Sequence, residues 1–545
     1  MPTVRVHVTN PEARLIEEGE RIWIVAGDRP EDIVDRIRTG SFVTPEHLVA
    51  DHSGESTVVR IDDDPSIRIR AHRGITSSFD WFYTRNGDTV VVGDHFREVL
   101  ASVPVHRRTV PDRVVREHLL LGGPVGRSHV EAVGRLGHGE TLVWNVDRAD
   151  RPDVRVTERL RPRTHLSPSS ARKRIDEYLR RTLSSDRFTD STTMLSGGTD
   201  STLMQSYLNA PTTVSAAYDS PEFAFEVENA CRASDALGTT HELVRRDESD
   251  ILADIETATD AAGVPLKHLQ TPIIHRAATE TTFTTYVNGE KAGGLFGYRT
   301  DVGHRLAGWT SPVIDAVPTV DWRVDWLKRS ARGLQTSVFD PNGVAMGFDI
   351  FADERRVAEL FGPDGVRDIK RARRRYVTER MTIDDETGFG PHVHLGHSFD
   401  FFEDSTVPIE RRAIHADGKA LVNPYLGKEL VETVLSVPPE RRYVRRLTSK
   451  YLLEDLLDRR VPTHEPHEEP GNTALPMERY QRTGPLSDAF ERYAVPEIVP
   501  ADRRAWIENA TGHLSWYALS YAIWRDRVLR DDSFEGYEST RTLVR

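Results

Sequence analysis

The sequence predicts an α/β protein with a β-rich N-terminal part, then a parallel α/β sheet, then a mainly helical C-terminal third. Three observations lead to this prediction. Residues 1–163 contain short runs rich in Val, Ile and Thr between turn-forming residues, which is typical of strands. Strand-like and helix-like segments then alternate, as they do around a parallel sheet. The last third carries apolar residues at helical spacing.

The N-terminal part is expected to contain several short strands and one amphipathic helix. The expected strands are residues 4–8, 21–25, 57–61, 67–71, 89–93 and 140–146, and the helix is 111–121. Residues 161–170 are polar and include two prolines, which is typical of a linker. We therefore expect two domains, residues 1–163 and residues 168–545.

The second domain opens with the alternating pattern. Helices are expected at residues 171–183, 201–208 and 226–237, and strands at 192–195, 214–218 and 284–288. Such alternation favours a parallel sheet covered by helices. Further along, the clearest helices are residues 428–436, 449–457 and 514–529.

Composition excludes several classes of protein. The 545 residues include one cysteine, Cys231, which rules out a disulfide framework and a cysteine-rich metal site. The net charge of −13 argues against general nucleic-acid binding. The apolar runs fall far short of the roughly 20 residues of a membrane helix. The N-terminus reads as a strand rather than as a signal peptide, so we expect a cytoplasmic protein with no membrane partner.

The strongest chemical signal is the segment TTMLSGGTDSTLM at residues 192–204. An expected strand runs into Ser196–Ser201, and an expected helix follows. The two glycines let the backbone approach an oxyanion closely, and N–H groups at a helix start bind phosphate together with serine hydroxyls. Asp200 is suited to hold Mg²⁺ between phosphates. An ordinary strand-to-helix turn with a serine cap has a similar outline, but the full SGGxDS string is more specific.

This loop resembles the pyrophosphate loop of the ATP pyrophosphatase superfamily. Other segments resemble, in order, those of the asparagine synthetase family, which includes β-lactam synthetases and lasso-peptide cyclases. They are residues 86–101, 118–144, 215–244, 288–298, 418–442 and 449–457. The resemblance implies a degenerate, glutaminase-like (Ntn-hydrolase-like) αββα sandwich followed by a PP-loop ATP pyrophosphatase domain with a helical C-terminal part.

The resemblance also implies a reaction. A carboxylate attacks the α-phosphate of ATP to give an acyl-adenylate and pyrophosphate, and a nitrogen nucleophile then displaces AMP to leave an amide. ATP and Mg²⁺ are the implied cofactors. The implied partners are a small-molecule or peptide carboxylate and an amine or ammonia. Family members often dimerise, so a homodimer is also among the expectations.

Site residues follow from the resemblance by position. The nucleotide-binding set comprises Leu195, Ser196, Gly197, Gly198, Thr199, Asp200, Ser201, Ala217, Asn288 and Gly289. Within it, Asp200 would hold the metal, while Leu195 and Ala217 would flank the adenine. Glu290 would be the acid near the substrate or the attacking amine; the alternative is a solvated loop carboxylate.

The chain departs from the family at the glutaminase nucleophile. Family members that hydrolyse glutamine expose a cysteine as residue two, but residue two here is Pro2. Cys231 falls on an expected helix of the other domain, where we expect a small buried apolar residue. The first domain should therefore keep the sandwich without its nucleophile, and we expect no glutaminase activity.

Further departures concern charged residues. Gly293 stands where the family's second acidic loop supplies a Mg²⁺ carboxylate, and Lys291 nearby could instead neutralise phosphate directly. Lys450 is retained as either a phosphate contact or a solvated helix lysine. Glu410 is expected to serve as a substrate- or base-positioning group, together with Arg411 and Arg412, or all three are exposed helix charges.

The family's late lysine is missing from the segment at residues 461–471. That segment has the prolines and charges of a loop, and its acidic and histidine side chains are either metal ligands or solvated. The side chains concerned are His464, Glu465, His467, Glu468 and Glu469.

Two functional hypotheses remain open from the sequence. In one, the protein is an amide-forming ligase that uses ammonia or an amine. In the other, the nucleotide fold survives as a binding or scaffold protein with little catalysis. The retained SGGTDS loop favours the ligase, while Gly293 and the missing late lysine favour the scaffold.

Overall fold

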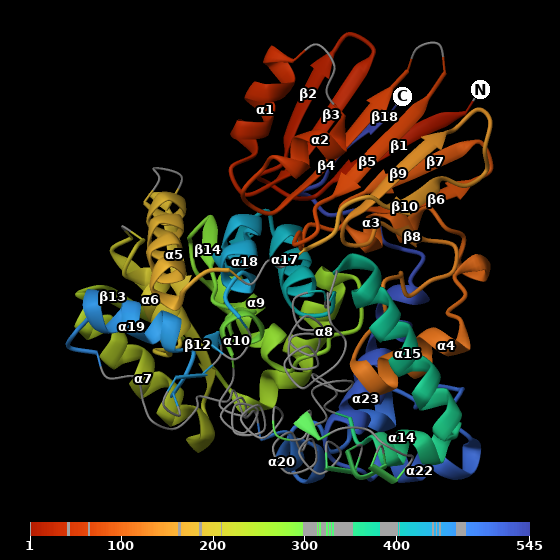
Figure 1. Cartoon of the computed structure of the whole chain (residues 1–545). Coiled ribbons are helices and arrows are strands. Elements are labelled where there is room, and N and C mark those ends of the chain that lie inside the picture. The colour runs from red at the N-terminus through yellow and green to blue at the C-terminus, as the bar shows by residue number, and fades with distance from the viewer. Residues whose placement is uncertain are drawn as a thin grey trace.

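The computed structural model in Figure 1 places a β-sandwich above a second, helix-rich region. It describes residues 2–297, 352–381 and 402–544, together with isolated helical residues between 313 and 331. Short gaps within those ranges fall at 41–43, 64–65, 162–164, 185–187, 209, 403, 439–440, 443, 446–447 and 465–475.

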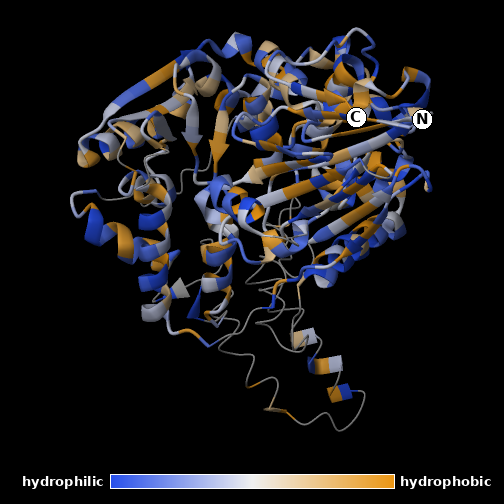
Figure 2. Cartoon of the chain, turned by 90° about the horizontal axis from the view of Figure 1, so that it is seen from above, coloured by the Kyte–Doolittle hydropathy of each residue, from blue (hydrophilic) through white to orange (hydrophobic). Residues whose placement is uncertain are grey.

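The N-terminal region consists of two sheets that share one apolar core. The first sheet has the order β18-β1-β7-β6-β8, with β1 (Thr3–Val8), β6 (Phe82–Asn86), β7 (Thr89–Gly93), β8 (Gly134–Arg135) and β18 (Arg541–Val544). The second is antiparallel, β10-β9-β5-β4-β3-β2, with β2 (Arg14–Glu18), β3 (Arg21–Gly27), β4 (Ser56–Asp62), β5 (Arg68–Arg73), β9 (Glu140–Asn145) and β10 (Asp153–Val156). Alternate residues of both sheets face the shared core, as the alternating hydropathy along the strands indicates (Figure 2).

Helices cover the outer face of each sheet. Residues of α1 (Pro30–Thr39) and α2 (Pro45–Ala50) pack with Trp23, Val25 and Val58 of the second sheet. Residues of α3 (Phe96–Ala101) and α4 (Asp112–Leu121) pack with Phe82 and Val91 of the first. The layer order is therefore helix, sheet, sheet, helix, which confirms the expected αββα sandwich.

The last strand of the chain belongs to this sandwich. Strand β18 pairs antiparallel with β1, so the C-terminal end lies beside the N-terminal strand (Figure 1). Just before it, the Ser539 hydroxyl donates to the carbonyls of His415 and Ala416 in the second region. The segment leading to β18 therefore contacts both regions.

A parallel sheet organises the second region. Its order is β13-β12-β11-β14-β15, with β11 (Ser191–Met194), β12 (Thr212–Tyr218), β13 (Thr240–Arg246), β14 (Thr285–Val287) and β15 (Ala420–Val422), and every neighbouring pair is parallel. The strands expected at 192–195, 214–218 and 284–288 correspond to β11, β12 and β14. The chain winds from β11 to one edge and then returns to the other side of β11, which places a topological switch point between β11 and β14.

Helices surround this sheet and fill the C-terminal part. They are α5 (Pro168–Leu183), α6 (Thr199–Gln205), α7 (Pro221–Leu237), α8 (Ile251–Ala262), α9 (Gln270–Glu280), α10 (Ala292–Phe296), α14 (Glu354–Phe361), α15 (Pro363–Arg380), α17 (Val407–Ala416), α18 (Lys428–Leu435), α19 (Tyr451–Arg460), α20 (Met477–Arg482), α21 (Ala489–Arg492), α22 (Ala501–Glu508) and α23 (His513–Trp524). A two-stranded ribbon joins β16 (Val444–Arg445) to β17 (Thr448–Ser449).

Helix α23 is buried around its whole circumference, since every residue of Leu514–Trp524 is buried. Among the described residues, no helix combines the length and the apolar character needed to cross a membrane.

Candidate nucleotide-binding site

Two loops meet at the switch point of the parallel sheet. One follows β11 and contains Ser196–Ser201; the other follows β14 and contains Asn288–Lys291. In open α/β sheets, ligands bind outside the carboxyl ends of the strands at this point. A Cβ atom on Gly289 would lie only 3.2 Å from Cβ of Asp200, so the backbone of the second loop approaches the first loop closely.

The first loop needs glycine at Gly197. Its φ of 75° is in the left-handed region, and a Cβ there would lie 2.3 Å from the carbonyl oxygen of Asn229 on α7. Gly198 has an ordinary φ of −76°, and the nearest atom to its would-be Cβ is Ser196 Oγ at 3.5 Å. Gly197 therefore shapes the loop against α7, while Gly198 stands at the open, helix-capping position.

Serine hydroxyls brace the same turn. The Ser196 N–H donates to Ser201 Oγ at 3.2 Å, and the two hydroxyl oxygens are 3.1 Å apart. Ser196 is exposed, and Gly198, Thr199 and Asp200 are half-buried, so the loop faces solvent that a ligand can displace.

Asp200 is the electrostatic centre of this loop. Its Oδ2 accepts a hydrogen bond from Lys450 Nζ at 2.6 Å, and its backbone carbonyl accepts one from the Tyr425 hydroxyl at 3.0 Å. Lys450 stands immediately before α19 in a left-handed conformation, φ 52°. The Lys450 side chain therefore lies against the loop, paired with Asp200, and its contact with phosphate stays a prediction.

The chemistry of Asp200 fits a magnesium ion. Its buried Oδ1 has no hydrogen-bond partner within the described parts of the chain. Across those same parts, no group of three or more His, Cys, Asp or Glu side chains could hold a metal ion by itself. A magnesium ion would therefore bind through Asp200 and the oxygens of a nucleotide, which is how Mg²⁺ is commonly held at phosphate sites.

The second loop is tied to the rest of the region through Asn288. Its Nδ2 donates to Glu410 Oε2 at 3.1 Å, and its Oδ1 accepts from Asn423 Nδ2 at 3.0 Å. Asn423 also donates to the backbone carbonyl of Glu290 at 2.9 Å. The Glu290 carboxylate accepts from Gln270 Nε2 at 3.2 Å, so it is not a freely solvated loop carboxylate.

Lys291 and Gly293 continue this loop into α10. Lys291 is only 7% exposed and caps the helix with a left-handed φ of 71°. Gly293 and Gly294 are buried within α10. The loop thus places a buried cation, with no additional carboxylate at Gly293, directly after Glu290.

The predicted charges of α17 are not exposed. Glu410, Arg411 and Arg412 are 1%, 2% and 5% exposed. The interpretation of these residues as exposed helix charges is wrong. The two arginines pair with acidic residues of the sandwich, and Glu410 accepts a hydrogen bond from Asn288 of the second loop. Leu195 and Ala217, expected beside the adenine, are also buried, at 1% and 3% exposed.

Cys231 contradicts a second expectation. It is exposed on α7 rather than buried as a small apolar residue. Asn229 and Ala230 of α7 lie against Gly197, and the side chain of Cys231, the next residue, lies on the outer face of the helix.

Several residues contact the two loops although the sequence did not predict these contacts. Asn229 Nδ2 donates to the Ser196 carbonyl at 3.4 Å, and buried His464 Nε2 donates to the Gly197 carbonyl at 3.0 Å. Tyr425 and Asn423 join the loops from a segment beyond α17. No sequence pattern links these positions to the loop; only the NPY string at 423–425, within a segment already compared with the family, could have drawn attention to two of them.

His464 is hydrogen-bonded to the first loop. Its Nε2 donates to the Gly197 carbonyl, and burial lowers the pKa of its imidazole. Glu465, His467, Glu468 and Glu469 lie outside the described residues.

Glu454 is a further acidic group near the first loop. It lies one turn after Lys450 on α19. Burial raises the pKa of Glu454 to about 7, and the charges of Asp458, Asp455 and Asp200 add to the shift against the opposing charge of Lys450. Its carboxyl therefore changes charge near neutral pH.

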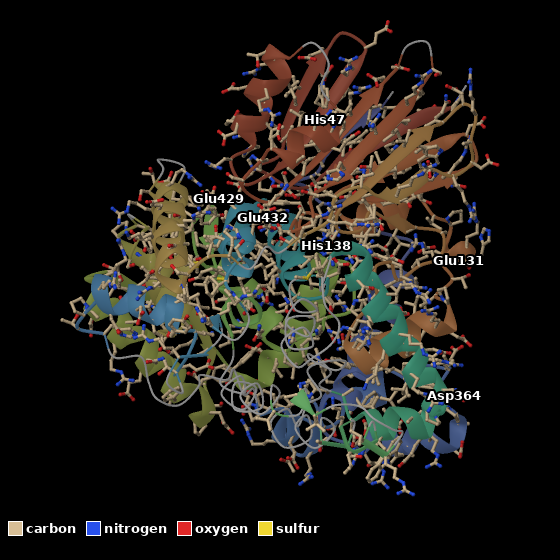
Figure 3. The ribbon with its side chains drawn as sticks, in the orientation of Figure 1. His47, Glu131, His138, Asp364, Glu429 and Glu432 are labelled. Atoms are coloured by element: carbon tan, nitrogen blue, oxygen red, sulfur yellow. The ribbon has the colours of Figure 1, made fainter. Side chains whose placement is uncertain are left out.

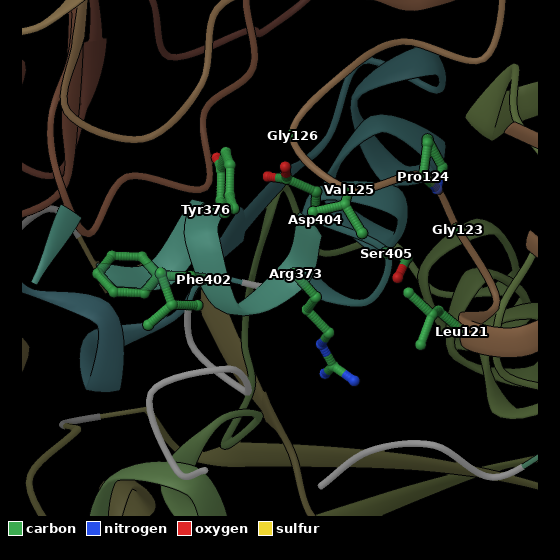
Figure 4. A pocket seen from close by; sticks show the side chains of 11 residues that line it. Leu121, Gly123, Pro124, Val125, Gly126, Arg373, Tyr376, Phe402, Asp404 and Ser405 are labelled. Carbon is green, nitrogen blue, oxygen red and sulfur yellow. The ribbon is translucent and has the colours of Figure 1, made fainter. Parts of the chain in front are cut away.

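A small cavity lies away from the two loops. It has a volume of about 40 Å³ and sits between the sandwich and α15 (Figure 4). Tyr376 and Asp404 point to one side of it and Arg373 to the other. No residue of Ser196–Ser201 or Asn288–Lys291 lines it, so this cavity is separate from the two loops.

Comparison with known protein families agrees with this geometry. A family model described as asparagine synthase matches residues 170–361, a range that contains both loops but not Glu410, Lys450 or His464. No curated protein matches the chain.

Proposed function

We propose that this chain, in which residues 170–361 match the asparagine synthase family, forms an amide through an acyl-adenylate. ATP-dependent carbon–nitrogen ligation is the activity of this family. The finer proposal is that a small-molecule or peptide carboxylate attacks the α-phosphate of ATP and pyrophosphate leaves. Ammonia or an amine then attacks the acyl carbon, and AMP leaves.

The proposal rests mainly on one observation: the two loops approach each other at Asp200, and Lys450 pairs with Asp200 there. Negative charge develops on the departing pyrophosphate. A cation and backbone N–H donors that are already held in position stabilise this charge most effectively. Ser196, Gly198 and Ser201 stand at the open turn, and Lys450 lies 2.6 Å from Asp200. Bound Mg²⁺, held by Asp200 with nucleotide oxygens, would supply Lewis-acid stabilisation of the phosphates.

The acidic groups of the second loop serve the nitrogen side of the reaction in this proposal. Glu290 is half-buried and held by Gln270, and Glu410 is held by Asn288. Either carboxylate can accept a proton from ammonium before attack, or from the amine as it attacks the acyl carbon. Lys291 places a buried positive charge beside them, where it can offset the substrate's negative charge.

We propose ammonia or an amine rather than glutamine as the nitrogen donor. Glutamine hydrolysis by the relatives' chemistry needs a cysteine thiol in the sandwich, and the only cysteine, Cys231, is exposed on α7 of the other region. Purified protein incubated with glutamine should release no ammonia beyond the rate without enzyme. Sustained ammonia release would show that the donor assignment is wrong.

The alternative is a nucleotide-binding scaffold with little catalysis, which Gly293 in place of a second metal carboxylate favours. Exchange of labelled pyrophosphate into ATP, measured across a panel of carboxylates, separates the two. The ligase proposal expects exchange with at least one carboxylate, lost at least a hundredfold in Asp200→Ala, an effect of about 3 kcal/mol. ATP binding without exchange for any carboxylate would favour the scaffold.

A further inference from the structure

Helix α17 carries three consecutive charged residues that contact two different regions of the molecule. Glu410 accepts a hydrogen bond from Asn288 of the second loop. The next two residues, Arg411 and Arg412, pair with Glu55 and Asp80 of the sandwich. In Figure 1 the helix lies directly beneath the sandwich. One turn of α17 therefore touches both the candidate site and the N-terminal region.

The pair between Arg411 and Glu55 is completely enclosed. Arg411 Nη2 lies 3.1 Å from Glu55 Oε1, and Glu55 is 0% exposed. The other carboxylate oxygen of Glu55 accepts from the Ser78 N–H at 2.7 Å, and the Arg411 guanidinium stacks 3.7 Å from the centre of the Phe79 ring. The Ser78 hydrogen bond orients Glu55 and the stacking on Phe79 orients Arg411, which together give this contact one geometry.

A second contact fixes the start of α17. Asp80 binds Arg412 and also accepts from Arg135 Nε at 3.0 Å. Asp404, which precedes the helix, accepts from Arg73 at 3.0 Å and from His138 at 3.0 Å. Figure 3 labels His138 at the boundary between the two regions. The sandwich thus holds α17 through three buried acid groups, two of its own and one of the α17 segment.

Buried charge pairs are a weak source of net stability, because desolvation offsets most of the attraction. Displacing either partner is costly, because it leaves an unpaired charge inside the protein, so such a pair restricts the relative positions of the two side chains. A cluster of this kind beside Glu410 therefore fixes position more than it adds stability.

We propose that the N-terminal sandwich positions the synthetase site: Glu55 and Asp80 hold Arg411 and Arg412, and so set Glu410 against Asn288. These four are positioning residues and touch no substrate. The inference rests on the proposed function for the role of Glu410. It gives the sandwich a task that needs no glutaminase chemistry.

The test compares two buried pairs that both join the sandwich to a helix of the second region. Glu55→Gln removes the charge that faces Arg411 on α17, and Glu140→Gln removes the charge that faces Arg380 on α15. The double variant Glu55→Gln/Arg411→Met keeps the fold free of an unpaired buried charge. Backbone hydrogen exchange of peptides covering 285–291 and 407–416 is measured in the full chain, with the unfolding temperature as the stability reference.

We expect Glu55→Gln and the double variant to speed exchange in residues 285–291 about tenfold, while Glu140→Gln leaves that peptide unchanged. Where pyrophosphate exchange is measurable, its kcat should fall with Glu55→Gln and not with Glu140→Gln at a matched loss of unfolding temperature. Equal effects of the two single variants on 285–291, or no effect of the double variant, would overturn the inference. Because hydrogen exchange requires no catalysis, a wild type without pyrophosphate exchange contradicts the proposed function alone.

Discussion

Lys450 Nζ and Asp200 Oδ2 lie 2.6 Å apart although 250 positions separate them in the chain. The contact joins the residue that precedes α19 to the glycine-rich loop after β11. It places a cation and a carboxylate together where the backbone is open to a ligand. A phosphate and metal site would use this arrangement, with the lysine binding phosphate oxygens and the carboxylate holding a metal.

Replacing Lys450 should weaken nucleotide binding specifically. A lost hydrogen bond to a charged group is worth about 1.5–3 kcal/mol, so Lys450→Met should raise the Kd of ATP by roughly 10- to 100-fold. Lys173→Met, which removes the same charge from an exposed position on α5, is the matched control and should leave the Kd unchanged. Calorimetric titration of both variants measures this. A Kd for Lys450→Met within twofold of the wild type would remove the lysine from the site.

The two loop glycines should respond differently to alanine. Gly197→Ala forces a side chain into a left-handed backbone and against the Asn229 carbonyl, so we expect a stability loss of roughly 1–3 kcal/mol together with lost ATP binding. Gly198→Ala meets only ordinary contact distances and should keep the unfolding temperature. Its ATP affinity should still fall, because the new methyl group stands where phosphate approaches. Thermal unfolding and ATP titration of both variants check the pair; equal unfolding temperatures would contradict the loop geometry.

Acid should loosen a contact between the two regions. Burial alone raises the pKa of Glu158, but its hydrogen bond with His72 and the charge of Lys428 outweigh burial and lower the pKa to about 2. The folded-state value lies below the ordinary 4.5, so the unfolded chain binds more protons between these values. The stabilisation is therefore present above pH 4.5 and is lost as the pH falls toward 2, with an upper bound of about 3 kcal/mol.

Glu158→Gln should flatten this part of the stability curve. Unfolding free energies measured from pH 5 to pH 3 should fall less steeply for the variant than for the wild type. Glu429→Gln is the control. Glu429 lies next to Lys428 on α18 and forms an exposed ion pair with Arg181, so the stability curve of this variant should follow that of the wild type. Parallel curves for the wild type and Glu158→Gln would refute the assignment.

The loops were predictable from the sequence because their signal is local. Strand β11 ends at Met194, two positions before Ser196, and β14 ends directly before Asn288, so the glycines and polar residues follow the predicted strands within a few positions. The order of alternating strands and helices likewise predicted the parallel sheet. Strands β13 and β15 of the parallel sheet were not predicted, because Leu243 and Val244 are the only apolar residues of β13 and β15 has only three residues.

The partners of the loops were not predictable because they come from distant segments. Tyr425 lies 225 positions from Asp200, and His464 lies 267 positions from Gly197. The local sequence pattern around a residue does not indicate which distant residue will contact it. The same holds for α17, where consecutive charges are typical of an exposed helix until Glu55 and Asp80, more than 300 positions earlier, are brought against them.

The proposal that a carboxylate is activated by adenylation can be tested by oxygen transfer from a labelled substrate. A carboxylate that supports pyrophosphate exchange is labelled with ¹⁸O in both oxygens and converted to product with ATP and the nitrogen donor. One carboxylate oxygen stays on the phosphorus when the amine attacks the acyl carbon, so AMP should carry one ¹⁸O atom and pyrophosphate none. ADP as the product, with ¹⁸O in inorganic phosphate, would show an acyl-phosphate route and contradict the claim.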